Sequence, residues 1–555
     1  MSGDPRGEGE SGVKETLVSL IISLAMALIV KCYVVEAYRI PTGSMAPTLL
    51  GVHATYTGPQ TGRSWFVDRG RPGEPPDQRG LLDPVTGLTH PGGPRVNALR
   101  AGATSPGARP AQAGDRILVQ KYLYDVTGPE RFDVVVFRNP TNVRENYIKR
   151  LVGLPNEHLW LADGDVFRSP FQSAQDPADA ALAAGTWECQ RKSLRTQRSL
   201  WRTLFSSEYT PLEPKSSMGG DWFQSPWSPR TGGWEMEGRR SYRYGRHEPT
   251  ALAWDTIAWP VTDWEPYNDR ARGSVAMYPV SDVRMRCNVE PEAADLTVTA
   301  TITARQHEFQ VVLGQGQATL QMRAASESGA AGPWTVLDSH ALKAMPVGRS
   351  TPIEFWHVDQ ALHVFVHGKR VLYAEYNWDP AQRLAFATGQ SFESLRTNGR
   401  GGVNLHALAD PATYAHGQAE VEWRFSGGPF TLHQVGLDRD IFYQPALGSR
   451  REVGFGCHPD RVVTLGPDHF FMLGDNSADS LDGRGWPDFP SNTPYGRTVD
   501  PFVAEHIDPA PGVVHRKLIL GKTFFVYFPA PLTVELFGFK LPIPVPDFGH
   551  MRIVE

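Results

Sequence analysis

Residues 40–49 read IPTGSMAPTL, which places Ser44 in a turn between two prolines. Pro41 and Pro47 restrict the backbone on either side of the serine, so its N–H group has a fixed direction. A serine hydroxyl is a weak nucleophile at neutral pH and needs a base held beside it. Taken alone, the stretch is explained at least as well as a Gly-Ser turn whose hydroxyl satisfies the backbone. The rest of the chain has to supply the base.

A candidate base lies in the stretch YIKRLVGLP at residues 147–155. Strand alternation puts Lys149 on the same face as Tyr147 and Leu151. A lysine acts as a base only when it is neutral, and burial among apolar side chains lowers its pKa. The alternative interpretation is a solvated lysine on an edge strand, where lysines discourage aggregation.

A third block, MLGDNSADSLDGR at residues 472–484, carries several acids and an arginine in a glycine-containing loop. A calcium loop is disfavoured, because the spacing does not fit the EF-hand template and no Glu occupies its twelfth position. We expect Asp482 and Arg484 to form a charged network with Arg150. The Ser480 hydroxyl is expected to hold the Lys149 amine in line.

Together the three blocks resemble the bacterial type I signal peptidase (leader peptidase) family of Ser/Lys proteases. The stretches Gly114-Asp115-Arg116 and 132–137 fit the same family pattern, and the third block departs from it at Ser477, Ala478, Asp479 and Gly483. The resemblance implies a coiled antiparallel β catalytic core. It assigns Ser44 as the nucleophile, Lys149 as the general base, and Thr42 and Ser44 as the oxyanion donors. The residues that it assigns to support these groups are Arg150, Asp475, Ser480, Asp482 and Arg484, and those that it assigns to the apolar substrate pocket are Ile40, Met45, Leu49, Tyr147 and Ile148.

The N-terminus precedes the serine turn with an uncharged stretch, TLVSLIISLAMALIV at residues 16–30. It is shorter than the roughly 20 residues that span a bilayer. Lys31 could extend its ammonium to the headgroups, which lengthens the usable span to about Val35. We therefore predict a transmembrane anchor, with a cleaved signal peptide as the rival because Ala25-Met26-Ala27 fits an A-x-A site. The resemblance implies a single-pass protein of the cell membrane with its catalytic domain on the extracytoplasmic side.

The fold class predicted from the patterns is mainly β: a transmembrane helix, a signal-peptidase-type antiparallel core and an inserted β-sandwich that is similar to a jelly roll. Strict alternation in LTVTATITA from Leu296 and a hairpin turn at His367-Gly368 support the sandwich. A second hairpin is expected at Asp163-Gly164. The predicted organisation begins with a disordered tail and anchor (1–37). The catalytic core is predicted in two segments, 38–167 and 455–530, and the first of them contains an irregular Pro/Gly-rich insertion (52–113). A large insertion (168–454), with the sandwich at about 285–430, separates the two segments, and a C-terminal tail (531–555) follows the second.

Composition narrows the function classes. The chain has 555 residues and a net charge of -5, with no basic run that would indicate nucleic-acid binding. Its four cysteines contain no CxxC pair, so a zinc ribbon has no support, and no metal or organic cofactor is predicted.

The favoured function is a membrane-anchored endopeptidase that cleaves signal peptides from preproteins after an A-x-A-like sequence. Its expected partners are these signal peptides, the lipid bilayer and the secretion translocon. A membrane-anchored binding protein, with the sandwich on a degenerate protease scaffold, is the alternative. A self-cleaving regulator of the repressor type is disfavoured, because it requires a nucleic-acid-binding domain where the apolar N-terminus lies.

Overall fold

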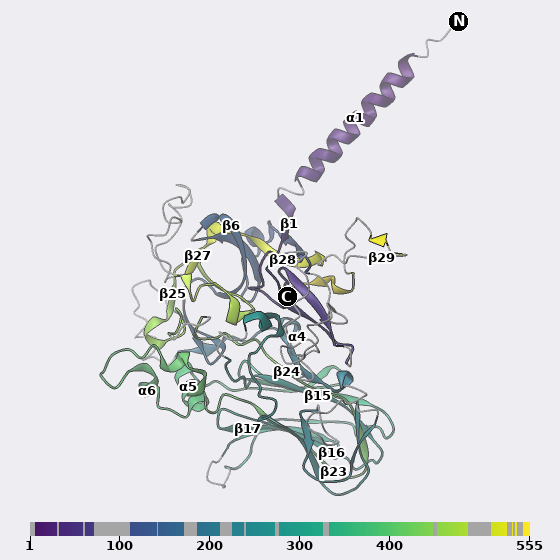
Figure 1. The fold of residues 1–555 in the computed structure, drawn as a ribbon, viewed down its shortest axis with the longest axis vertical. Helices are drawn as coiled ribbons and strands as arrows, with labels where there is room; N and C mark the ends of the chain where they lie inside the picture. Colours follow the sequence, from purple (N-terminus) through teal and green to yellow (C-terminus); the bar gives the residue numbers. More distant parts are fainter. Residues whose placement is uncertain are drawn as a thin grey trace, which may run out of the picture.

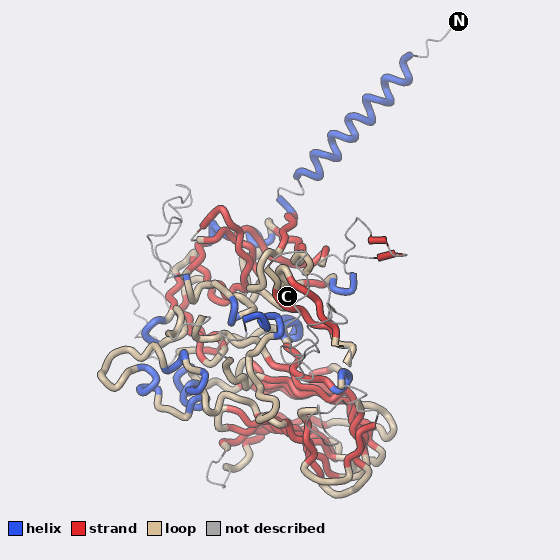
Figure 2. The backbone as a smooth tube through the Cα atoms, in the orientation of Figure 1, coloured by secondary structure: helices blue, strands red, loops and turns tan. Residues whose placement is uncertain are grey.

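Antiparallel strands make up most of the regular structure in the computed structural model (Figures 1 and 2). This agrees with the mainly β class expected from the sequence. The structure describes residues 6–29, 33–58, 61–70, 111–140, 142–170, 186–210, 225–237, 240–271, 277–325, 332–447, 452–486, 512–529, 535–536, 539–540 and 548–555.

An eight-stranded sheet forms the core that carries the three sequence blocks. Its order along the sheet is β1 (Val35–Arg39), β4 (Arg116–Gln120), β28 (Ile519–Phe528), β5 (Val134–Asn139), β6 (Asn142–Gly153), β26 (His469–Leu473) and β27 (Val513–His515), with β31 (Arg552–Ile553) paired to β28. Alternate residues of β5 enter different apolar clusters: Val134 and Val136 pack with Ile40, whereas Val135 and Phe137 pack with Leu151. Both faces of the sheet are therefore covered, which explains the continuous apolar run of β5.

A smaller sheet continues the core through β25 (Val463–Leu465), β7 (Glu157–Ala162), β8 (Asp165–Pro170) and β9 (Glu188–Cys189). The expected hairpin at Asp163-Gly164 is confirmed, because both residues have positive φ between β7 and β8. The expectation of an irregular segment from residue 52 is wrong for its beginning. There β2 (His53–Thr57) and β3 (Ser64–Asp68) form a hairpin whose Tyr56, Trp65 and Val67 are buried. Residues 71–110 lie outside the described residues.

The insertion contains two large antiparallel sheets, which Figure 1 shows in the half of the molecule away from α1. One sheet has the order β12 (Trp234–Glu237), β13 (Ser241–Tyr244), β24 (Phe430–Arg439), β15 (Val283–Pro291), β20 (Thr351–Val358), β21 (Ala361–Val366) and β22 (Lys369–Glu375), with β10 (Arg202–Ser206) paired to β24. The other has the order β11 (Trp227–Pro229), β14 (Thr250–Trp254), β23 (Glu420–Ser426), β16 (Thr297–Ala304), β17 (His307–Gly314), β18 (Gln317–Ala324) and β19 (Thr335–Ala341).

The two sheets share one apolar core, as a sandwich requires. In β16 the side chains of Val298, Ala300 and Ile302 are fully buried, which confirms the alternation. The hairpin at His367-Gly368 is also confirmed by two positive φ angles between β21 and β22. The sandwich extends beyond the predicted range of 285–430. Its additional strands β10 to β14 are only three to five residues long, which is too short to show a clear period.

Helices are few. The longest, α1 (Arg6–Ile29), projects away from the body (Figure 1). In the described part of the chain the others are α2 (Leu123–Val126), α4 (Leu194–Leu200), α5 (Pro380–Thr388) and α6 (Phe392–Arg396), besides short 3₁₀ turns such as η4 (Pro266–Ala271) and η8 (Ser477–Asp479). Within the described ranges, no helix combines the length and the hydropathy that a membrane span requires.

The expected C-terminal tail belongs to the core where it is described. β31 pairs with β28, and Val554 is buried in the same cluster as Ile40, Met45 and Leu49. A short apolar segment carries too little periodicity to reveal such packing in the sequence. A further short hairpin joins β29 (Glu535–Leu536) and β30 (Phe539–Lys540).

The three described cysteines, Cys189, Cys287 and Cys457, are buried and free. Burial raises the pKa of the Cys457 thiol to about 12, so this side chain behaves as a small apolar residue. Cys32 lies outside the described residues.

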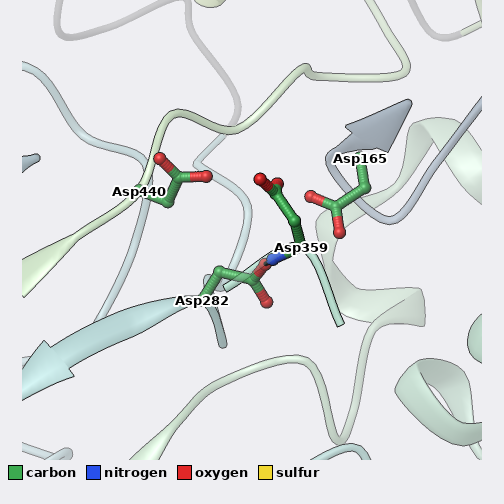
Figure 3. Close-up of side chains that lie close together, drawn as sticks. All are labelled: Asp165, Asp282, Asp359 and Asp440. Atoms are coloured by element: carbon green, nitrogen blue, oxygen red, sulfur yellow. Dashed lines mark hydrogen bonds between the residues drawn. The ribbon is translucent and has the colours of Figure 1, made fainter. Parts of the chain in front are cut away.

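Four buried aspartates lie together where the core meets the insertion, and we call them the aspartate node (Figure 3). Asp165 begins β8, Asp282 precedes β15, Asp359 lies in the turn after β20, and Asp440 follows β24. One carboxylate oxygen from each residue lies within 4.8 Å of the others. Such a group could hold a cation or could pair with cationic side chains.

Cationic side chains of the protein itself contact each member of the node. Lys192 Nζ lies 2.9 Å from Asp440 and also pairs with Asp359. Arg305 Nη1 lies 2.8 Å from Asp282, and Arg383 Nη2 lies 2.8 Å from Asp165. The node is therefore a buried ion-pair network that joins β8 of the core to the sandwich.

Replacing Arg383 with methionine tests this network. The substitution leaves buried carboxylates without a partner, so we expect the free energy of unfolding to fall by about 3–5 kcal/mol. Arg424→Met is the matched control, because the Arg424 side chain is 59% exposed beside Glu422 and its pair should contribute under about 1 kcal/mol. Urea denaturation of the full chain measures both. Equal effects of the two substitutions would contradict the role of the node.

Candidate active site

The turn that contains Ser44 is closed by one buried aspartate. Ile40 N donates to the Asp115 carbonyl at 2.9 Å, and Asp115 N donates to the Leu50 carbonyl at 2.9 Å. Leu50 N in turn donates to Asp115 Oδ2 at 3.0 Å. Both ends of the loop at residues 40–50 are thus fixed to a single residue that precedes β4, which limits the positions available to Ser44.

Asn476 from the third block holds the backbone around Ser44. Its N–H donates to the Ser44 carbonyl at 3.1 Å, and its Nδ2 donates to the Gly43 carbonyl at 3.0 Å. Ser44 is half-buried and Thr42 is exposed, so the predicted nucleophile and the predicted oxyanion hydroxyl lie on an accessible side of the turn.

Lys149 lies in β6 and is 3% exposed. Its Nζ donates to Ser480 Oγ at 3.0 Å, which is the contact expected from the sequence. The amine lies 5.9 Å from the centre of the Tyr147 ring, so these two side chains share a face as predicted. Burial lowers the pKa of Lys149 to about 8; Asp482 opposes this shift and Arg484 adds to it.

Ser44 and Lys149 are brought into the same region by Gly474. A Cβ atom at position 474 would lie 2.1 Å from Ser480 Oγ and 2.5 Å from the Ser44 carbonyl oxygen. The hydroxyl that binds the Lys149 amine and the backbone of Ser44 therefore both contact this glycine. Among the described contacts, the Lys149 amine donates to Ser480 and not to Ser44.

The prediction that Asp482 and Arg484 form one charged network with Arg150 is wrong. The structure has two separate ion pairs instead. Arg150 binds Asp475 through Nε and Nη2, both at 2.7 Å, and not Asp482. Arg484 binds Asp482 through Nε at 2.9 Å and Nη2 at 2.7 Å, and Asp482 also accepts the Gly474 N–H at 3.0 Å. Burial acts to raise the pKa of each carboxyl, but the paired guanidinium outweighs it and holds the pKa below its ordinary value.

The predicted substrate pocket is only partly brought together. Ile40, Met45 and Leu49 are buried and pack with the half-buried Ile148. Tyr147 lies in a different cluster, beside Phe137. Adjacent residues of a strand face opposite sides, which explains why Tyr147 and Ile148 separate.

Sequence reasoning missed the residues that the insertion adds to the site. Asn268, in η4, exchanges two amide hydrogen bonds with Asn476 at 2.6 and 2.8 Å. The Tyr267 ring covers Gly43 so closely that a Cβ there would lie 2.2 Å from it. η4 is a six-residue 3₁₀ helix in a segment without periodicity, so no pattern in the sequence indicates these contacts.

Ser477 and Gly483, two of the four positions where the third block departs from the family pattern, fit their surroundings. The Ser477 hydroxyl accepts hydrogen bonds from Gln444 N at 2.7 Å and from Arg484 Nη1 at 2.8 Å. A Cβ at Gly483 would lie 2.6 Å from the Phe471 ring, so the glycine leaves room for that side chain. Gln444 belongs to the insertion, which therefore also supports Arg484.

Comparison with solved structures finds distant likenesses. A carbohydrate binding module, CBM66 from Bacillus subtilis, is 5% identical with a TM-score of 0.22 and covers 38% of this chain and 95% of that chain. The galectin LEC-6 of Caenorhabditis elegans is 12% identical with a TM-score of 0.17, and the match covers 30% of this chain and 88% of the galectin chain. TM-scores of this size carry no argument about fold or ligand.

Sequence comparison points to the family that the motifs resemble. Residues 105–176 match the family described as signal peptidase, peptidase S26, and this range includes Lys149 but not Ser44. A signal peptidase I of Rickettsia canadensis is 36% identical over 88 residues, which is 15% of this chain and 31% of that protein. A signal peptidase I of Buchnera aphidicola is 40% identical over 58 residues, which is 8% of this chain and 19% of that protein. The chain spans less than a third of the length of these curated relatives, and over the matched segment it is related to the S26 signal peptidases.

Proposed function

We propose that this chain is a membrane-associated serine endopeptidase that removes signal peptides from exported preproteins, with Ser44 as nucleophile and neutral Lys149 as base. The observation that carries the proposal is the state of the Lys149 amine. It is buried, it donates a hydrogen bond to Ser480, and burial lowers its pKa to about 8. A lysine in that state can accept a proton near neutral pH.

The proposed reaction begins with the neutral amine of Lys149. One of its N–H bonds donates to Ser480, which leaves the nitrogen lone pair available for the Ser44 hydroxyl. As Ser44 Oγ attacks the substrate carbonyl, its proton moves to Lys149, and the developing oxyanion is bound by the Ser44 N–H and the Thr42 hydroxyl. Donors of this kind contribute about 10²–10³-fold in rate each.

The second half of the reaction returns the proton. Lys149, now an ammonium, protonates the leaving amine as the peptide bond breaks and an acyl-enzyme forms at Ser44. Water then attacks the ester, with Lys149 again accepting a proton, and the signal peptide leaves with a new carboxylate. No cofactor is needed for either half.

The apolar cluster at the turn supports the proposed preference for small side chains before the scissile bond. Met45 and Leu49 are fully buried, and Ile148 is half-buried at the edge of the same cluster. Little space remains there for a large substrate residue, which fits the A-x-A-like sites expected from the resemblance.

We further propose that α1 associates with the cell membrane and that the catalytic core acts on its extracytoplasmic side, where the secretion translocon would be a partner. The helix projects from the body (Figure 1), and apolar side chains along it are exposed. A protease held at the same membrane as its substrate gains effective concentration. The supporting side chains, each more than half exposed, are Leu17, Leu20, Ile21, Ile22, Leu24 and Met26.

Substitution of the two proposed catalytic residues is the first test. With a preprotein that carries an A-x-A site, in detergent and in lipid vesicles, we expect Ser44→Ala to abolish cleavage and Lys149→Met to lower kcat by at least about 10²–10⁴-fold. Lys121→Met is the matched control, because the Lys121 side chain is 30% exposed and pairs with Glu36. Full activity of either catalytic variant would refute the dyad, and an inert wild type would favour the binding-protein alternative.

The stability of Lys149→Met separates a catalytic from a structural lysine. The folded-state pKa lies below the ordinary value of 10.5, so burying the ammonium lowers stability below about pH 8. This effect disappears as the pH rises through about 8 toward 10.5. We therefore expect Lys149→Met to unfold at the same or a higher urea concentration than wild type at about pH 7. A large loss of stability would indicate a structural role.

The pH dependence of cleavage follows from the same pKa. Because the active form of Lys149 is neutral, kcat/KM should rise about tenfold per pH unit below about pH 8 and level off above it. The measurement is a kcat/KM profile from about pH 6 to about pH 10. A profile that is flat or falls through this range would show that Lys149 is not the titrating base.

Gly474→Ala tests whether the close contact at Gly474 holds the base in place. The added Cβ would overlap with Ser480 Oγ and with the Ser44 carbonyl, so one of them must move. We expect cleavage to fall about tenfold or more, with a loss of about 1–3 kcal/mol in stability. Gly232→Ala is the control, because a Cβ there meets nothing within 4 Å. Unchanged cleavage by Gly474→Ala would show that the Lys149–Ser480 contact does not position the base.

A further inference from the structure

A cavity of about 270 Å³ lies beside the Ser44 turn, between the core and the insertion. Pro47 of the turn lines it on one side, and β3 contributes Phe66. Trp201 and Tyr267 line it from the insertion, and the Tyr267 ring also covers Gly43. The cavity therefore adjoins the turn that carries the proposed nucleophile.

Two donors of the cavity lining lack an acceptor in the described structure. They are the indole Nε1 of Trp201 and the Nε of Arg439, both buried atoms of residues that are 8% and 4% exposed. A buried donor without a partner destabilises the folded chain, so an acceptor that reaches it is favoured. Both atoms are themselves covered, so a ligand in the cavity reaches them only if the two side chains turn toward it, and it must then offer acceptor oxygens, such as peptide carbonyls or a carboxylate.

The charge of the lining points to the same kind of ligand. Glu265 is the one acid among the residues that line the cavity. It lies 3.8 Å from Arg202 Nε and 3.5 Å from Arg439 Nη2, so two guanidinium groups share one carboxylate. The excess positive charge favours a ligand that is acidic or rich in carbonyl groups.

We propose that this cavity binds the segment of the substrate polypeptide that follows the scissile bond, and that it favours acidic residues there. The inference rests on the proposed function. α1 leaves the core on the side opposite the sandwich (Figure 1), and the cavity lies where the core meets the insertion. With α1 at the membrane, the segment that extends away from the membrane is the one after the cleavage site. Pro47, which lines the cavity, lies three residues after Ser44, and an extended chain advances about 3.3 Å per residue, so a few substrate residues are enough to reach from the scissile bond to the cavity.

The insertion in this interpretation is a substrate-binding element. Arg202 Nη2 donates to Thr48 Oγ1 at 3.2 Å, which ties the cavity wall to the Ser44 turn. A polypeptide bound in the cavity would therefore be held by the insertion and cut by the core. Preproteins cleaved at identical A-x-A sites would be distinguished by the residues that follow.

The test uses the full chain and preproteins that differ only in the first residues after the A-x-A site, with either Glu or Lys in this stretch. We expect wild type to cleave the Glu series with a kcat/KM about 2–10-fold higher than the Lys series. Trp201→Phe keeps the ring but removes the donor, and should raise KM for the Glu series about 3–10-fold with kcat unchanged. Trp227→Phe is the matched control, because Trp227 Nε1 is also buried without a partner but lies outside the cavity. Glu265→Gln, which removes the lone acid, should widen the preference for Glu.

The outcomes separate this inference from the proposed function. Cleavage of both series at equal kcat/KM, unchanged by Trp201→Phe and Glu265→Gln, would overturn the cavity assignment and leave the proposed function standing. An equal KM increase in Trp227→Phe would also overturn it, because the effect would then be structural. No cleavage of either series by wild type would overturn the proposed function and, with it, the assigned occupant of the cavity.

Discussion

The Lys149 amine is buried without a carboxylate of its own, and the surrounding residues are arranged around that constraint. Of the three carboxylates in the neighbouring loop, two are bound by separate arginines: Asp475 by Arg150 and Asp482 by Arg484. Within the described residues the amine has a neutral hydroxyl as its hydrogen-bond partner, that of Ser480. The attraction of Asp482 and the repulsion of Arg484 act in opposite directions, so desolvation decides the pKa. Had Asp482 lacked its arginine, it would have held Lys149 as an ammonium.

The insertion belongs to the site and is not an independent appendage. Asn268 fixes Asn476, which in turn holds the backbone at Gly43 and Ser44. Gln444 binds Ser477 and thereby supports Arg484. The aspartate node joins the same insertion to β8 through buried ion pairs. Loss of the insertion would remove the hydrogen-bonding partners of the Ser44 turn as well as the sandwich.

Local patterns in the sequence were sufficient for features that depend on neighbouring residues. The face of Lys149, the contact between Lys149 and Ser480, and the turns at Asp163-Gly164 and His367-Gly368 all follow from alternation, turn chemistry or the motif. Features that depend on distant residues were not predictable in the same way. The sequence offers Arg150 two candidate partners, Asp475 and Asp482, and does not indicate which one it binds. The folded structure shows that it binds Asp475. Asn268 lies in a short 3₁₀ helix with no period to reveal its partner.

The position of β28 has a consequence for how the core sheet is completed during synthesis. β28 lies between β4 and β5, so the strands next to the Ser44 turn and the strands that carry Lys149 are joined through a segment that is synthesised long after both. Pairing between strands that are far apart in the sequence forms slowly. The long chain between β5 and β28 has to fold before β28 can pair, or loop out between them. Until residues 519–528 are in place, the two halves of the core sheet have no strand between them. On the proposed function, a growing chain that already contains Ser44 and Lys149 therefore stays inert toward nearby polypeptides, its own N-terminus included, until residues 519–528 have been made and paired.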